Sequence, residues 1–434
     1  MDEYKIPSDF KHWKTGGYAN IYKFHDEIIK ELPLLSENGD YLQYSSFMEI
    51  IMTKTLPKFS HFVDCHAVYI TNNRVYIHQE YLGETLYHWT KNTPLEERLL
   101  SIPNIIYQML TICIFLQSRG IQHTDLKPTN FIWNNNKLYL IDYNCISIMC
   151  SHNGQLLFSK AVGTWNYAAP EVIVCSNIDT TSIVWSIGMI LCELFDDYPI
   201  SSKYYPYKLN EKRKYWINMF KIIYDSEFSD LAFINSYSSI PEPWNGWIKR
   251  MLMWNPKNRI SLIQLRSFIL NQFTTIPLIS IKQDNIEVIP YHHKNKRSKI
   301  LDVLYGYAIK MNEEYKLCLA IYIWDMFSSN IDDKNYKLYL CAAWALSSFM
   351  YNNYSDTEDL RKELKIKCVD IQPYIIEIGD KTDWHLYAKT VDIYLHIKYT
   401  KVPWDLFIQF YSTYTNNYIP SSLAADFFKK YPSI

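Results

Sequence analysis

The strongest constraint on this chain is a pair of neighbouring segments in its first half. The first reads HTDLKPTNFIW from His123 to Trp133, and the second reads KLYLIDYN and carries Asp142 at the end of a predicted strand. One short loop therefore contains an acid, a lysine and an amide, and a second acid follows it. The spacing predicts that the loop places four polar groups around one point: Asp125, Lys127, Asn130 and Asp142.

These four groups match what phosphoryl transfer requires of a protein. The reaction needs a residue that orients the attacking hydroxyl, a cation beside the phosphates, and carboxylate and amide ligands for Mg²⁺. We expect Asp125 to accept or orient the proton of the substrate hydroxyl, and Lys127 to neutralise charge on the transferred group. Asn130 and Asp142 would hold the metal.

At these residues the chain resembles the protein kinase family, whose pattern is H-R-D-x-K-x-x-N followed by D-F-G. Lysine at position 127 is the serine/threonine form of that pattern. The resemblance implies ATP and Mg²⁺ as cofactors and a protein as substrate. It extends in the family's order from residue 11 to residue 270, through a glycine loop (Gly16, Gly17), a third-strand lysine (Lys30), a helix-C glutamate (Glu49), a hinge (Glu80, Leu82), and AAPE and NPKNR segments that end at Glu171 and Arg259.

The resemblance implies a role for each of these residues. Lys30 would contact the α- and β-phosphates if a buried acid held it in place. Glu49 is the expected partner, and Glu31 is an alternative nearby. Glu171 and Arg259 would form a buried ion pair that is structural and not catalytic. The glycine loop and the hinge would bind the nucleotide.

Three features depart from the family pattern. The family's three glycines fall on Lys14, Gly16 and Ala19, so only one is kept, with Gly17 beside it. The D-F-G triplet is D-Y-N, in which Asn144 tolerates left-handed backbone better than most residues do. Ile183 replaces a buried aspartate that anchors the catalytic loop, so another group must supply that rigidity.

These departures favour a rival interpretation, a pseudokinase scaffold that binds nucleotide or partner proteins without turnover. Against this rival, the chain keeps every group that would touch phosphate, metal or nucleophile. A sequence freed from catalysis has no reason to retain all five of them: Lys30, Asp125, Lys127, Asn130 and Asp142.

The patterning predicts an α+β fold with two lobes and a further helical domain. Short β-branched runs indicate a mostly-β N-lobe over residues 1–82, with one helix near residues 47–53. Apolar residues at spacings of three and four indicate a mostly helical C-lobe over residues 83–273. Residues 274–299 contain prolines and a basic run and are predicted to be a linker.

Residues 300–434 are predicted to form an all-α bundle. The order of the helical segments, with the second and third strongly apolar, resembles a cyclin box, and the whole chain resembles a cyclin-dependent kinase fused to its own activator. In that case Lys337 and Glu358 occupy the places of the cyclin residues that contact the partner kinase. An unrelated helical docking domain is the alternative.

The loop between Asp142 and Glu171 lacks the cations that bind an activating phosphate in many kinases. Their places fall on Thr124, Met48 and about Ser147. A phosphate on Ser151, Ser159 or Thr164 would therefore bring little ordering energy. We expect activity without activation-loop phosphorylation, with apolar packing of Leu156, Leu157 and Phe158 or the helical domain holding the loop.

Composition limits the partners and the compartment. A formal net charge of -1 and a pI of about 6.9 predict no nucleic-acid partner. The nine cysteines are scattered without C-x-x-C pairs, which indicates reduced thiols and a cytoplasmic location. The apolar windows are short, so no membrane partner is expected. The excess of tyrosine over glycine suggests AT-rich codons, as in a large DNA virus or a protist. A viral protein would lie in host cytoplasm or virion.

Overall fold

The computed structural model divides the chain into two compact units. The first comprises Met1–Glu49, Lys58–Ile148 and Leu157–Lys282, and the second comprises Ile50–Pro57, Met149–Leu156 and Gln283–Ile434. The residues that the structure describes are 4–16, 19–35, 43–56, 59–71, 73–152, 155–158, 163, 164, 166–175, 178–196, 240–279, 294–311, 316–327, 335–351, 360, 364 and 372–382.

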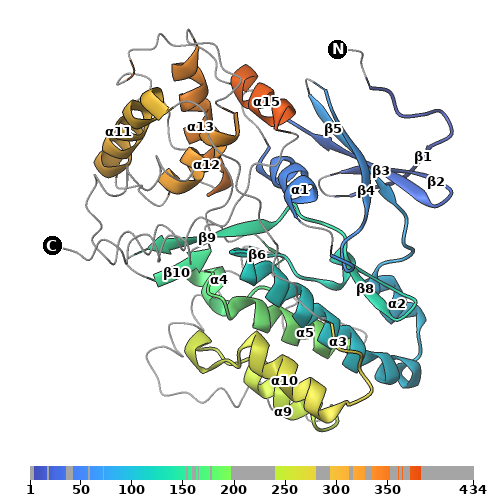
Figure 1. Ribbon diagram of the computed structural model, residues 1–434. Coiled ribbons are helices and arrows are strands. Elements are labelled where there is room, and N and C mark those ends of the chain that lie inside the picture. The colour runs from blue at the N-terminus through green and yellow to red at the C-terminus, as the bar shows by residue number, and fades with distance from the viewer. Residues whose placement is uncertain are drawn as a thin grey trace. The chain divides into compact units, whose positions relative to one another are not determined.

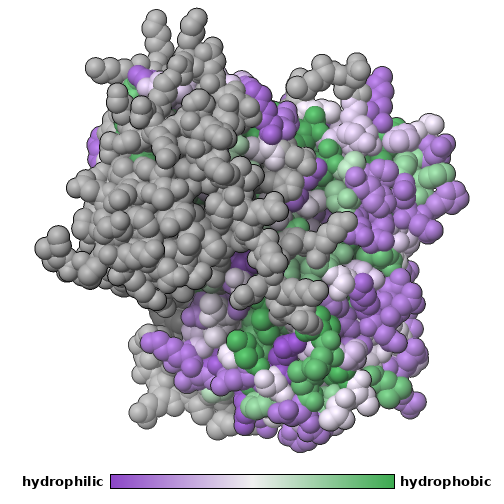
Figure 2. All heavy atoms as spheres, viewed as in Figure 1, coloured by the Kyte–Doolittle hydropathy of each residue, from purple (hydrophilic) through white to green (hydrophobic). Residues whose placement is uncertain are grey.

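The N-lobe contains a five-stranded antiparallel sheet in the order β1-β2-β3-β5-β4 (Figure 1). Alternating burial along β5, where Val75 and Ile77 are fully buried, agrees with the period of two that the sequence predicts. Every residue of β1 is exposed, and hydrophilic residues predominate around β1 and β2 in Figure 2. The strands are β1 Lys11–Thr15, β2 Asn20–Phe24, β3 Glu27–Pro33, β4 Cys65–Ile70 and β5 Arg74–Glu80.

One helix, α1 (Tyr44–Thr55), lies between β3 and β4 in the chain. It contains the helix predicted near residues 47–53. Its residues Phe47, Ile50 and Ile51 are completely buried, and so is Met48. A helix buried this widely is held by packing and not by intrinsic propensity, so the position of Glu49 on it depends on the surrounding core.

The C-lobe is mostly helical, as predicted. Its central helix α3 is long and apolar enough to cross a membrane, but 67% of its most apolar window is buried inside the protein. The buried guanidinium of Arg98 donates a hydrogen bond to the Leu194 carbonyl oxygen at 2.8 Å, which suits a core helix. The helices are α2 Leu86–Asn92, α3 Leu95–Ser118, α4 Pro170–Cys175, α5 Ser182–Asp196, α9 Trp244–Met251 and α10 Leu262–Gln272, with short 3-10 helices at Pro128–Asn130 and Pro256–Asn258.

Short strands on the C-lobe surround the predicted catalytic loop. A tight hairpin joins β7 to β8 through Asn135 and Asn136, whose φ angles of 49° and 59° lie in the left-handed region. This reversal carries the chain back to Asp142. The strands are β6 Ile121–His123, β7 Phe131–Asn134, β8 Lys137–Leu140, β9 Ile146–His152 and β10 Gln155–Phe158, where β6 pairs with β9 and β9 with β10.

The second unit contains four described helices of the C-terminal third. They are α11 Lys294–Met311, α12 Leu317–Phe327, α13 Tyr336–Met350 and α15 Gln372–Lys381. Helix α11 begins at Lys294, inside the predicted linker and before the predicted start of the helical domain at residue 300. Lysine and arginine favour helix almost as well as leucine does, so the basic run extends the apolar helix backward.

The helices α12 and α13 have closely packed cores. Ala342 and Ala343 are completely buried, and their small side chains permit a close approach between helices. The ring of Tyr307 meets Trp344 edge-on at 5.3 Å between centroids. Lys337 donates a hydrogen bond to the Leu364 carbonyl oxygen at 2.9 Å. Its predicted companion Glu358 lies outside the described residues.

Candidate active site

The structure brings three of the four predicted catalytic-loop residues into direct contact. The Lys127 ammonium forms an ion pair with the Asp125 carboxylate and donates to the Thr164 hydroxyl at 2.9 Å. The Asn130 amide nitrogen donates to the Asp125 carbonyl oxygen at 2.8 Å. The backbone N–H of Thr164 donates to the second carboxylate oxygen of Asp125. These contacts orient the Asp125 carboxylate before any substrate binds.

Thr164 can approach Asp125 because the preceding residue is glycine. A Cβ atom at Gly163 would lie 2.6 Å from the carbonyl oxygen of Thr124, closer than real Cβ contacts allow. Gly163 and Thr164 therefore pack backbone to backbone against the catalytic loop. Sequence reasoning considered Thr164 only as a phosphorylation site and missed this contact.

Asp125 is held in its ionised form. It is 7% exposed, and burial alone would raise its pKa, but the Lys127 ammonium and the bond from Thr164 lower the pKa below its ordinary value. The carboxylate can therefore orient a hydroxyl and accept its hydrogen bond at neutral pH.

His123 fixes the position of Asp142 through its ring. Nε2 bonds to the Asp142 carbonyl oxygen at 2.9 Å, and Nδ1 accepts from the Asp125 backbone N–H at 3.2 Å. A carbonyl only accepts and an N–H only donates, so the ring is the neutral Nε2–H tautomer. Burial lowers the pKa of His123, which agrees with the neutral form.

The D-Y-N triplet differs from our expectation in one respect. Asn144 does not adopt a left-handed backbone, because the described non-glycine residues with positive φ are His25, Asn135 and Asn136. Asn144 instead donates its backbone N–H and its side-chain amide to the Asp142 carboxylate, at 3.0 and 3.2 Å. Its side chain therefore orients the predicted metal ligand, which a glycine could not do.

Lys30 pairs with Glu49 and not with Glu31. The distance from Lys30 Nζ to Glu49 Oε1 is 2.9 Å, and Nζ also donates to the Ile141 carbonyl oxygen. Glu31 instead accepts hydrogen bonds from Asn20 and the Tyr22 hydroxyl. The second Glu49 oxygen accepts from the Tyr143 backbone N–H, so this glutamate ties α1 to the D-Y-N segment.

Lys30, Glu49 and Asp142 form a cluster with one cation and two acids. Burial lowers the pKa of Lys30, but the carboxylates of Glu49 and Asp142 reverse this effect and raise it, so the ammonium stays charged. Burial raises the pKa of Glu49 to about 7, and Asp142 adds to this effect while Lys30 opposes it. Glu49 is therefore the acid of this cluster that can hold a proton near neutral pH.

The predicted nucleotide-binding residues are only partly tested by the structure. Gly16 donates its N–H to the Ala19 carbonyl oxygen at 2.8 Å, between β1 and β2. Gly17 lies outside the described residues. Glu80 ends β5, and the Leu82 carbonyl oxygen accepts from the Asn134 amide at 3.0 Å. Their contacts with adenine remain predictions.

Glu171 and Arg259 form a bidentate ion pair, with both guanidinium nitrogens on the carboxylate. Arg259 also donates to the carbonyl oxygens of Met253 and Trp254, at 2.7 and 3.2 Å. The Arg259 side chain is completely buried. Since every contact is internal to the C-lobe, the pair has the geometry of a structural tie.

A group of polar residues that sequence reasoning missed lies near Ile183, which is buried at 3% exposure. Gln117 donates to the Gln122 side chain at 2.7 Å and to the Thr180 carbonyl oxygen at 2.8 Å. Gln122, next to His123, donates to the Asp179 carbonyl oxygen at 3.3 Å.

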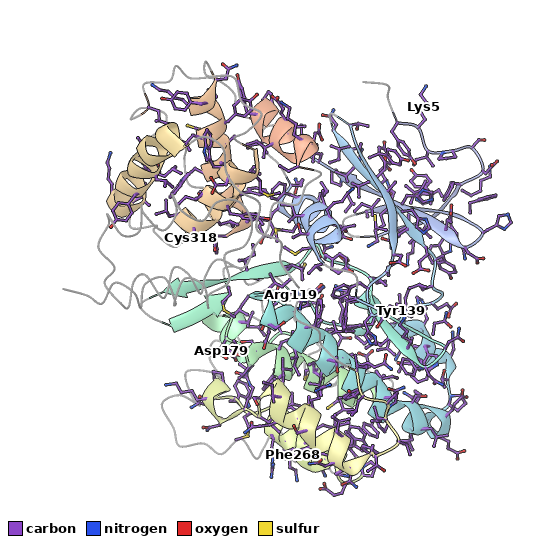
Figure 3. All side chains as sticks on the ribbon, viewed as in Figure 1. Lys5, Arg119, Tyr139, Asp179, Phe268 and Cys318 are labelled. Atoms are coloured by element: carbon purple, nitrogen blue, oxygen red, sulfur yellow. The ribbon has the colours of Figure 1, made fainter. Side chains whose placement is uncertain are left out.

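Figure 3 labels Asp179 in the loop before α5. Its N–H donates to the Ser182 hydroxyl, which donates to Glu171 at 2.7 Å. This chain of hydrogen bonds joins the catalytic loop to the Glu171–Arg259 pair. The available sequence signal for Gln122 was a polar residue placed directly before His123, where the catalytic loop begins.

The three positions that lack cations are filled by packing. Met48 and Ser147 are completely buried. The Thr124 hydroxyl and backbone N–H both donate to the Cys145 carbonyl oxygen at 2.9 Å. Thr124 therefore ties the catalytic loop directly to the segment after Asp142. Ser159 lies outside the described residues, and the side chain of Ser151 is not described.

Comparison with known proteins places this geometry in a family. The protein kinase domain model matches residues 18–268, which is more than half of the chain. A probable serine/threonine-protein kinase of Dictyostelium discoideum is 26% identical over 205 residues, and this covers 46% of the chain and 39% of the relative.

Two further relatives give the same result. CBL-interacting protein kinase 10 of Oryza sativa subsp. japonica is 28% identical over 215 residues, covering 47% of the chain and 42% of the relative. Serine/threonine-protein kinase MAK of Homo sapiens is 27% identical over 237 residues, covering 50% and 38%. The chain thus spans about two-fifths of the length of these curated relatives.

Proposed function

The chain belongs to the protein kinase family, and from this premise we propose that it is an enzyme that transfers the γ-phosphoryl group of ATP to serine or threonine in a protein. One observation carries the proposal: the five groups that phosphoryl transfer requires are all retained and are all positioned by bonds within the first unit. They are Lys30, Asp125, Lys127, Asn130 and Asp142.

The residues present fit a Mg²⁺ ion. The Asn130 amide nitrogen is committed to the Asp125 carbonyl, which leaves its side-chain oxygen as the atom available to a metal. Each Asp142 oxygen accepts a single hydrogen bond from Asn144 and keeps acceptor capacity. An amide oxygen and a carboxylate are the donors that Mg²⁺ prefers, and the ion would neutralise charge on the phosphates.

The protein's own residues then have distinct tasks. Asp125, ionised and held by Thr164, orients the serine or threonine hydroxyl and accepts its proton. Lys127 balances charge on the transferred group, and Lys30 holds the α- and β-phosphates. Glu49 positions Lys30 and touches no substrate.

A radiolabel transfer assay tests this function. Full-length wild type, Asp125→Asn and Asp9→Asn would be incubated with labelled ATP, Mg²⁺ and a basic protein substrate. Asp9 is exposed and remote in sequence, so Asp9→Asn serves as the matched control. We expect wild type and the control to label serine or threonine and Asp125→Asn to lose transfer.

The pseudokinase alternative predicts a different outcome in this assay and in a thermal unfolding measurement. Wild type would be stabilised against heat by ATP and Mg²⁺ yet would label nothing. Labelling on tyrosine alone would overturn the substrate class while leaving the phosphotransferase assignment intact.

We also propose that the helical third activates the kinase lobes in the same chain. The cyclin-like order of its helices and the short linker support this, because a tethered activator has a high effective concentration. Removing residues 294–434 should leave a folded protein with much lower transfer, since Glu49 depends on packing around α1. Full activity of a folded truncated chain would instead favour a docking module.

Finally, we propose that activity does not require activation-loop phosphorylation. The two hydrogen bonds from Thr124 to the Cys145 carbonyl oxygen support this. Thr124 stands at the position where many kinases have an arginine that binds the activating phosphate, and here it holds the segment without one. Phosphatase-treated protein should transfer phosphate at the rate of untreated protein. A drop of about tenfold or more, equivalent to about 1.4 kcal/mol, would contradict the proposal.

A further inference from the structure

Three potential metal ligands meet on the N-lobe sheet, away from the residues described above. Glu27 begins β3, His66 lies on β4 and His78 lies on β5. In the sheet register Ile29 pairs with His78, so Glu27 lies diagonally across from His78 on the same face. An irregularity between Cys65 and Ala67 shifts the register of β4, and His66 lies within it.

The ligand atoms lie close to one another. His78 Nε2 is 3.0 Å from Glu27 Oε2, and His66 Nδ1 is 3.7 Å from Glu27 Oε1. All three ligand atoms lie within 4.8 Å of one another. Zinc bonds of about 2.0–2.1 Å in a tetrahedron place ligand atoms about 3.4 Å apart, so small side-chain rotations would close this site.

The surroundings suit a bound ion. The ring of Phe10 meets His78 edge-on at 5.4 Å between centroids, which limits its rotation. The His66, Glu27 and His78 side chains are 44%, 42% and 22% exposed, so an ion can enter and water can fill the fourth position. Each ligand comes from a different strand of one sheet, and such rigid elements hold metal ligands well.

We propose that Glu27, His66 and His78 bind a divalent transition metal, with Zn²⁺ as the ion best suited to two imidazoles and a carboxylate. Mg²⁺ prefers oxygen ligands, so this site would not compete with the proposed site at Asn130 and Asp142. The bound ion would cross-link β3, β5 and β4. This metal-site proposal does not depend on the proposed kinase function.

Zinc binding by the full-length chain tests the inference directly. Metal-free protein would be titrated with Zn²⁺ against a chromophoric chelator, for wild type, His66→Ala/His78→Ala and Glu27→Gln. His12→Ala is the matched control, because His12 is an exposed histidine on β1 outside the cluster. We expect one fewer tight zinc per chain in the double variant, and at least about a tenfold loss of affinity in Glu27→Gln.

Two further measurements keep the test decisive. Saturating Zn²⁺ should raise the melting temperature of wild type and His12→Ala but not of the double variant. Co²⁺ in the same site should show the visible absorption of tetrahedral nitrogen and oxygen ligation. If wild type and the double variant bind the same number of zinc ions with the same affinity, the binding is adventitious and the site does not exist. If the double variant misfolds, the zinc affinity of Glu27→Gln, which changes a single side chain, still tests the site.

Discussion

Two buried ion pairs of the first unit, Lys30–Glu49 and Arg259–Glu171, differ in how many hydrogen bonds the cation makes. An ammonium has three donors. Among the described residues, Lys30 donates two hydrogen bonds, one to Glu49 and one to the Ile141 carbonyl oxygen. Arg259 places four hydrogen bonds on Glu171 and two backbone carbonyls. The first pair retains a donor for a ligand, whereas the second is nearly saturated.

The electrostatics of the two pairs differ in the same way. The pKa of Glu49 is raised to about 7, so the first pair can be switched by a proton or by a nearby charge. Glu171 has a bidentate partner and a further bond from Ser182, which is the geometry of a permanent contact. Lys30 can therefore bind a phosphate while it stays paired with Glu49, whereas Arg259 is engaged within the protein.

We expect the largest effect when the Glu171–Arg259 pair is broken. Arg259→Met leaves the Glu171 carboxylate buried without its partner, so the free energy of unfolding should fall by about 3–5 kcal/mol. Urea denaturation would measure it. The double variant Glu171→Leu/Arg259→Met should recover part of the loss, because no unpaired charge remains. Additive losses in the double variant would contradict this.

Breaking the other pair should affect activity more than stability. In Lys30→Met, Glu49 is able to hold a proton, so the fold loses little, but the transfer rate should fall by about a hundredfold or more. The rate at saturating ATP and the urea midpoint would be measured on the same preparation. A variant that unfolds as readily as Arg259→Met would show that the two pairs do not differ.

The pH dependence of the Lys30–Glu49 pair should have two opposite signs. Between the ordinary value of 4.5 and about 7, folded protein holds the Glu49 proton and unfolded chain releases it. The contribution of Glu49 to stability is therefore present at low pH and lost as the pH rises through this window. Transfer needs the ionised pair, so its rate should rise as the pH approaches 7, by about tenfold per unit.

Glu49→Gln is the control for this pH profile. The amide keeps the volume of the side chain and cannot titrate. Its transfer rate should be low and should lack the rise between pH 6 and 7 that, by our account, wild type shows. A rise of the same size in Glu49→Gln would assign the pH dependence to the substrate or to another residue.

We expect the smallest effect when the hydrogen bonds that join the catalytic loop to the Glu171–Arg259 pair are removed. Gln122→Leu removes hydrogen bonds to Gln117 and the Asp179 carbonyl, which should lower the unfolding free energy by about 1 kcal/mol. The double variant Gln117→Leu/Gln122→Leu should lose less than the sum of the single variants. Strict additivity would mean that the two glutamines act separately.

Much of this site could be predicted because its chemistry depends on short sequence spacings. Asp125, Lys127 and Asn130 lie in one loop, so their contact follows from the motif. Glu49 was the expected partner of Lys30 because apolar residues flank it at helical spacing, and the structure decides against the alternative, Glu31. Gln122 was missed because the Asp179 carbonyl oxygen, to which it donates, belongs to a residue more than fifty positions away in the chain.

Local preference also misled in two places. Asn144 was expected to use its tolerance of left-handed backbone, but its amide binds Asp142 instead. The basic residues from Lys294 were predicted to be a linker, yet they continue the helix α11.

The rate of γ-phosphate transfer in Asp142→Asn is the most direct test of whether the clustered groups perform phosphoryl transfer. This change keeps the size of the side chain and an oxygen that can accept the backbone N–H of Asn144, while it removes the charge of the metal ligand and the acceptor for the Asn144 side-chain amide. We predict loss of measurable transfer at any Mg²⁺ concentration, with an unchanged melting temperature in the absence of nucleotide. A transfer rate equal to that of wild type would contradict the account.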